Sequence, residues 1–181
     1  MERFVNNILP QVPGSSKTII EQEVLRIAIE FCQNSLIWQT ATEKTVAATA
    51  STFTLGTETD SQIADCYVFL NEVLYEDYTR SEAVVTLYDA VTAETDFDTI
   101  SFLKPTEDAD DLPDILYHDW FEGIAAGAKS RLQMMPGKKW TSLKLAAINQ
   151  ALYQHNLNHA RVKARMTGIY TEFTIKRDTN F

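Results

Sequence analysis

Residues 123–130, GIAAGAKS, contain two glycines followed by a lysine and a serine, the residue types of a phosphate-binding loop. That loop needs four residues between its glycines and then Gly-Lys-Ser/Thr. Here three residues separate Gly123 from Gly127, and an alanine precedes the lysine. The preceding LPDILYHDWFE has helical periodicity, and Pro113 and Asp114 favour a helix start. We therefore expect GIAAGAKS to lie inside a helix, with both glycines against a closely packed neighbour.

Other residues that could do chemistry are scattered or grouped in surface-like runs. His155 and His159 are four apart on a predicted helix, but no glutamate stands between them and His118 lies on another segment. Cys32 and Cys66 lie among apolar residues and are expected in the core. Acidic residues come in runs such as DADD, and neither a nucleophile elbow nor a Gly-x-Gly-x-x-Gly pattern occurs. The sequence therefore favours a protein that is not an enzyme and has no cofactor or metal.

Three principal helices are expected, besides a short one over residues 2–9. The first begins near Thr18, where Glu21 completes a capping box, and continues to about Leu36. The second contains GIAAGAKS and ends at Pro136. The third begins at Thr141 or Ser142 and continues to Gly168, a rod on the order of 40 Å long.

The third helix contains an apolar stripe and a basic end. Leu145, Ile148 and Leu152 form the stripe, with Ala147 and Ala151 beside it. The last turns carry Arg161, Lys163 and Arg165 and few large apolar groups. That end therefore projects or is covered by another molecule.

The middle of the chain favours strands. Residues 46–55, 63–75 and 97–103 are rich in β-branched and aromatic residues. Residues 84–91 fit either a short helix capped by Ser81 or a strand. Residues 169–181 alternate apolar and polar side chains as an extended strand does, and pair with their own sheet or a neighbour's.

These elements predict an α+β fold that is mainly helical. A helical bundle of three principal helices forms the body (residues 1–42 and 106–168), residues 43–105 form a β-rich insertion, and residues 169–181 form an extended C-terminal tail. No apolar run approaches the roughly 20 residues of a membrane span, and the start lacks the features of a secretion signal. We expect a soluble protein with no membrane partner.

Charge is unevenly distributed along the chain, whose net charge is −9. Residues 43–122 hold nineteen acidic and three basic residues, and residues 123–181 hold ten basic and two acidic residues. The two parts either form complementary surfaces between molecules or neutralise one another within the monomer. A DNA-binding or packaging-associated protein using the basic helix is the alternative function, although the acidic middle opposes DNA over most of the surface.

Four segments resemble the head-to-tail adaptor, or connector, proteins of short-tailed bacteriophages. They are ILPQVPG before AIEFCQNSLIW, the β-rich middle, LPDIL before WFEGIAAGAKSRLQMMPGKKW, and LAAINQALYQHNLNHARVKAR. The resemblance implies a ring of subunits, usually twelve, docked on the portal protein and presenting a platform to a tail or nozzle protein. It places the chain at the head-tail junction of a virion, assembled in the host cytoplasm, with DNA passing nearby.

Two sets of residues are candidate contacts for this role. The candidates for contact with the portal or a neighbouring subunit are Arg161, Lys163, Arg165, Ile169, Phe173, Ile175, Lys176, Arg177 and Phe181. The candidates for an acidic face toward the channel or a basic tail protein are Glu107, Asp108, Asp110 and Asp111.

Overall fold

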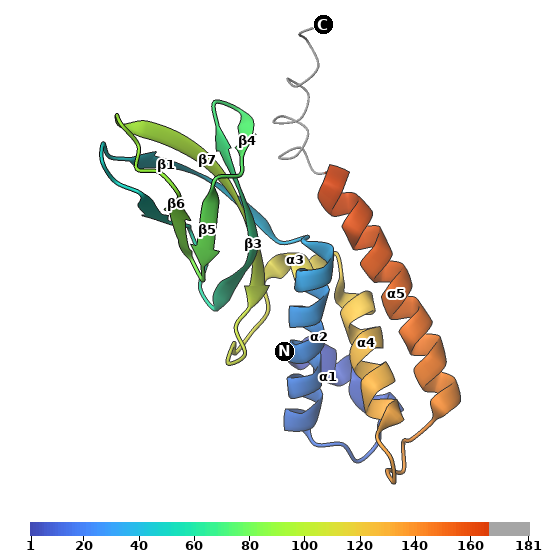
Figure 1. Cartoon of the computed structure of the whole chain (residues 1–181). Helices are drawn as coiled ribbons and strands as arrows, with labels where there is room; N and C mark the ends of the chain where they lie inside the picture. The colour runs from blue at the N-terminus through green and yellow to red at the C-terminus, as the bar shows by residue number, and fades with distance from the viewer. Residues whose placement is uncertain (167–181) are drawn as a thin grey trace, which may run out of the picture.

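Helices and strands occupy separate layers of the molecule (Figure 1). The computed structural model describes residues 1–166, of which 43% are helical and 26% lie in strands. The α+β class is therefore confirmed. The prediction of a mainly helical bundle is not confirmed, because the described middle of the chain forms seven strands in two sheets.

The helical layer contains five α-helices within the described residues: α1 (Glu2–Ile8), α2 (Lys17–Ser35), α3 (Asp114–His118), α4 (Phe121–Met134) and α5 (Leu143–Met166). A 3-10 turn, η1 (Leu9–Gln11), follows α1. Helix α2 begins earlier than predicted because the hydroxyl of Ser16 accepts the backbone N–H of Ile19. It ends as predicted, where Leu36 takes a left-handed conformation. Helix α4 lies between α2 and α5 (Figure 1).

The single helix predicted from Pro113 onward is two helices. Asp119 and Trp120 separate α3 from α4. Trp120 is buried, and its ring lies 5.5 Å from the ring of Phe31 in α2. The break therefore turns a large aromatic side chain into the core, a tertiary requirement that helical periodicity alone does not show.

GIAAGAKS lies within α4, as predicted, and both glycines face close neighbours. A methyl group on Gly123 would lie 2.6 Å from Cβ of Asn156 in α5. One on Gly127 would lie 2.8 Å from Ile27 of α2 and from Tyr153 of α5. The predicted close packing is confirmed, because α4 approaches two helices at its glycines.

The strands form two antiparallel sheets. β1 (Gln39–Val46), β7 (Thr95–Pro105), β3 (Ser61–Leu70) and β4 (Val73–Tyr75) make the four-stranded sheet, in that order. β2 (Thr52–Thr54), β6 (Val84–Leu87) and β5 (Tyr78–Ser81) make the three-stranded sheet. All pairs are antiparallel.

Several predicted strands differ in extent from those observed. The strand predicted over residues 46–55 is interrupted between β1 and β2. The run 63–75 forms the hairpin β3–β4, because Asn71 and Glu72 have positive φ and reverse the chain. A helix capped by Ser81 is wrong, and the strand alternative is correct, since β6 pairs with both β2 and β5.

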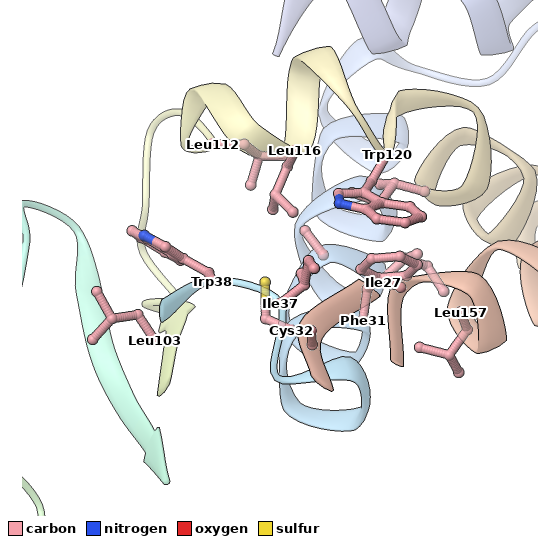
Figure 2. Packing of buried hydrophobic residues seen from close by; sticks show 14 of the residues in the cluster. Ile27, Phe31, Cys32, Ile37, Trp38, Leu103, Leu112, Leu116, Trp120 and Leu157 are labelled. Carbon is pink, nitrogen blue, oxygen red and sulfur yellow. The ribbon is translucent and has the colours of Figure 1, made fainter. Parts of the chain in front are cut away.

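One hydrophobic core extends from the helices into the β part. Ile37 and Trp38 lie where the chain crosses from α2 to β1 (Figure 2). Leu103 of β7 lies on one side of Trp38, and Leu112 and Leu116 lie on the other. The two layers are therefore joined through buried side chains as well as through the connecting chain.

Candidate interaction surfaces

The histidines do not form a metal centre in the described part of the chain. Within residues 1–166, no three His, Cys, Asp or Glu side chains are placed to hold one ion. His155 and His159 lie on the exposed side of α5, and the ring of His159 lies 5.5 Å from that of Trp120, edge to face.

Both cysteines are free and buried, so the expectation of core side chains is confirmed. Burial raises the pKa of the Cys32 thiol to about 12. Burial also raises the pKa of Cys66, and the Tyr78 hydroxyl, 3.8 Å from its sulfur, acts in the opposite direction. Both thiols are therefore protonated at neutral pH, which suits packing and disfavours nucleophilic attack.

A polar cluster joins the three long helices. The hydroxyl of Tyr153 donates a 3.1 Å hydrogen bond to Glu30, and Arg131 forms an ion pair with the same carboxylate. Burial, and then the charge of Glu30, raise the pKa of Tyr153 above its ordinary value. Since each member comes from a different helix, the cluster fixes α2, α4 and α5 against one another.

The basic end of α5 contacts the rest of the molecule. Arg161 donates a 2.8 Å hydrogen bond to the carbonyl of Asn34, and Nζ of Lys163 lies 2.6 Å from a carboxylate oxygen of Asp119. Arg165 is exposed, whereas Ala160 and Ala164 are buried against the body. The expectation that this end projects or is covered by another molecule is thus wrong for its inner side, where small alanines allow close packing. The remaining candidates, Ile169, Phe173, Ile175, Lys176, Arg177 and Phe181, lie outside the described residues.

The acidic candidates lie in the loop between β7 and α3. Glu107, Asp108 and Asp110 are exposed. Asp111 accepts hydrogen bonds from the Met1 amino group, at 2.7 Å, and from the Tyr117 hydroxyl. Burial acts to raise the pKa of Asp111, but these hydrogen bonds outweigh it and the pKa is lowered. Asp111 therefore has a structural role that the other three carboxylates do not share.

An acidic cleft of about 880 Å³ opens between this loop and the β part. It is lined by residues 37–39, 57–60 and 111–115. Its charged lining residues are Glu58, Asp60, Asp111 and Asp114, all of them acidic. Its other lining includes Ile37, Trp38, Leu112 and Ile115, so cations and apolar groups suit it better than nucleic acid does.

The first half of the outer face of α5 is apolar, uncharged and exposed. Leu145, Ile148 and Leu152 are 46%, 56% and 42% exposed. At the same helical spacing the face continues through the exposed histidines His155 and His159 to Val162 and Met166. Residues 145–160 contain no Asp, Glu, Lys or Arg. The opposite face, with Tyr153 and Leu157, packs on the body. An exposed helix face is ordinarily charged, so this one has the composition of a contact surface.

Sequence periodicity identified the apolar stripe of α5 but did not show that the stripe faces away from the body of the molecule. The inner positions of α5 include Ala146, Ala160 and Ala164, which are smaller than the outward leucines and isoleucine. Periodicity favours burial of the larger side chains, whereas the inner face of α5 mixes these alanines with the large Tyr153 and Leu157. The uncharged run 145–160 was the available signal of a second covered face.

Comparison with known proteins adds no relative. No protein-family model matches the chain, and no curated protein matches its sequence. Within residues 1–166, no helix is both long and apolar enough to span a membrane.

Proposed function

We propose that this chain is a structural protein of a tailed-phage virion, a head-to-tail adaptor whose copies form a ring between the portal and the tail protein and extend the DNA channel. The observation that carries the proposal is the outer face of α5, Leu145, Ile148 and Leu152 with the uncharged run around them. The order of motifs that resembles the adaptor family supplies the kind of assembly. The function needs contact surfaces and no reacting groups.

The outer face of α5 has the residue spacing of a contact between helices. The three side chains recur at steps of three and four residues, the spacing of a helix-packing seam. Moving each half-exposed aliphatic side chain out of water contributes about 1 kcal/mol. A ring closes through heterologous contacts, in which this face of one copy meets a different face of the next.

The basic helix supports DNA binding less well than it supports the ring. Arg161 and Lys163 already bind protein groups in the described structure. A DNA-binding surface needs Lys and Arg side chains that are free to contact phosphates. Only the cations that contact phosphates release counterions from the DNA and so contribute to affinity. The acidic cleft and the acidic loop would repel a duplex that approached from their side.

Substitution of Ile148 by Asp tests the proposal. A carboxylate within a helix contact loses its hydration without gaining a partner, at a cost of about 3 kcal/mol, or ~100-fold in affinity. DNA-filled heads of the parental phage, assembled without this protein, are mixed with purified chain and imaged by electron cryomicroscopy. We expect wild-type chain to form a ring beneath the portal and Ile148→Asp chain to leave most heads without one.

Gln154→Asp is the matched control. Gln154 is exposed on the same helix about a third of a turn from Ile148, so the substitution adds the same charge outside the stripe. Control chain should attach like wild type, and circular dichroism should show both variants folded. Normal rings from Ile148→Asp chain, or no ring from wild-type chain, would contradict the proposal.

A further inference from the structure

We propose that residues 167–181 dock, within their own chain, on the outer face of the four-stranded sheet. This face is the side of β1, β7, β3 and β4 that points away from the three-stranded sheet, and it is called the outer sheet face below. The inference does not depend on ring assembly. It assigns an interaction surface to a part of the fold that the proposed function does not use.

Strand register defines the outer sheet face. Side chains directly opposite one another across a sheet point to the same side. Ala41, Ile100 and Tyr67 form one row across three strands, and Phe102 lies in the neighbouring row. Phe69 and Leu74 extend the face onto β4. The centre of the outer sheet face is therefore apolar. The other side of the sheet presents the row Thr42, Thr99 and Val68, of which Val68 belongs to the main core.

The centre of the outer sheet face is deeply buried. Ile100 and Phe102 are 1% and 0% exposed. They belong to a cluster separate from the main core, with Phe69, Tyr67 and Leu36. Tyr67 and Phe69 are in the same sheet, so Leu36 is the hydrophobic member that another described element contributes. A sheet buried on both sides needs a layer over each, and Leu36 is a single side chain at the end of α2.

The described chain ends beside this face. The carbonyl of Ala164, two residues before the end of α5, accepts a 3.1 Å hydrogen bond from the side chain of Gln39. Gln39 is the register partner of Phe102, so the last turn of α5 lies at the first row of the outer sheet face. In Figure 1, α5 continues past the end of α2 toward the sheet that holds β3 and β7. Residues 167–181 begin where the apolar face begins.

The sequence of residues 167–181 is complementary to the face. Ile169, Phe173 and Ile175 stand at alternate positions and would place apolar side chains on one side of an extended segment. Fifteen residues can extend to roughly 50 Å, more than enough to cross four strands. Lys176 and Arg177 follow, and carboxylates of Glu43, Asp65 and Asp98 border the apolar rows. Apolar contact in the centre of the face and opposite charges at its border favour docking of residues 167–181 over their solvation.

Photo-crosslinking from position 173 tests the docking. Full-length chain carrying benzoylphenylalanine in place of Phe173 is irradiated at low concentration, and the products are mapped by mass spectrometry. We expect crosslinks to β3 or β7 within a product of monomer mass. Crosslinks to another surface, or only in products of dimer mass, would overturn the proposal, the second outcome assigning the segment to a neighbouring copy.

Phe173→Asp chain provides a second measurement that does not need a crosslink. Loss of docking exposes Ile100 and Phe102, so binding of the dye ANS should rise by about threefold or more. Thr174→Asp, whose side chain would point away from the face, should leave the fluorescence near the wild-type value. Equal fluorescence from both variants, with circular dichroism unchanged, would contradict the docking. Because Ile148→Asp tests assembly and leaves this segment intact, failure of one proposal is distinguishable from failure of the other.

Discussion

At the scale of single residues, burial decides how the two thiols react. Only a thiolate attacks a disulfide reagent at an appreciable rate, and the pKa of Cys32 is raised to about 12 by burial. The same burial keeps reagents away from the sulfur. Cys32 lies in α2 and Cys66 in β3, so their reactivity reports on both layers of the fold.

We expect neither cysteine to react with Ellman's reagent at pH 8 in the folded chain, and both to react in guanidinium chloride. The raised pKa favours the protonated thiol in the folded state, so folding is favoured below the ordinary thiol pKa and loses that contribution as the pH rises toward 12. Gln33→Cys, which adds an exposed thiol next to Cys32, is the control and should react within minutes. Rapid reaction of two thiols in folded wild-type chain would contradict this account.

At the scale of elements, the glycines of α4 set how closely the helices pack. In an exposed helix, replacing glycine by alanine stabilises by about 1 kcal/mol through helix propensity. At Gly127 the added methyl would lie 2.8 Å from Ile27 and from Tyr153, which are both buried. Neither neighbour can move without disturbing the polar cluster or the core, so overpacking outweighs propensity.

We expect Gly127→Ala to lower the free energy of unfolding by about 1–3 kcal/mol, as measured by urea denaturation followed by circular dichroism. The reverse exchange at an exposed site of α5, Ala151→Gly, should lower it by about 1 kcal/mol through propensity alone. An increase in stability of Gly127→Ala chain would show that the helices can separate to admit the methyl group.

Local patterns predicted the interior of elements better than their boundaries or directions. The start of α5 directly after Ser142, whose hydroxyl accepts the backbone N–H of Leu145, and the position of β7 followed from capping and alternation. The break at Trp120, the turn at Asn71 and the outward direction of Ile148 depend on neighbours distant in the sequence. The acidic loop could be found from charge alone, whereas the contact surface on α5 required knowledge of which side of the helix the body occupies.

At the scale of the whole molecule, the acidic middle segment and the basic last third make few ion pairs with each other within the described residues. Within residues 1–166, Lys163–Asp119 is the ion pair that joins the acidic middle to the basic last third. Arg131 pairs instead with Glu30 in the first helical segment. The acidic cleft and the exposed loop therefore keep a negative potential, which weakly repels nucleic acid and attracts a basic partner.

Reversal of the loop charges tests this role. In the chain Glu107→Lys, Asp108→Lys, Asp110→Lys, three exposed carboxylates become cations, and Asp111 is retained because it binds Met1 and Tyr117. Three added cations can contact phosphates and release counterions from DNA. In a gel-shift assay, the variant should therefore bind duplex DNA in low salt and release it as the salt concentration rises. Wild-type chain should not bind. Under the proposed adaptor function, with the loop facing the channel, the variant should also slow DNA ejection from virions, because cations on that wall would bind the phosphates of passing DNA. The control chain carries lysine at Glu76, Asp77 and Asp89, exposed carboxylates elsewhere in the β part with the same total charge change. Equal DNA retention by the two variants would assign the effect to net charge. Unchanged assembly and ejection with the loop variant would contradict a position of the loop at the channel wall.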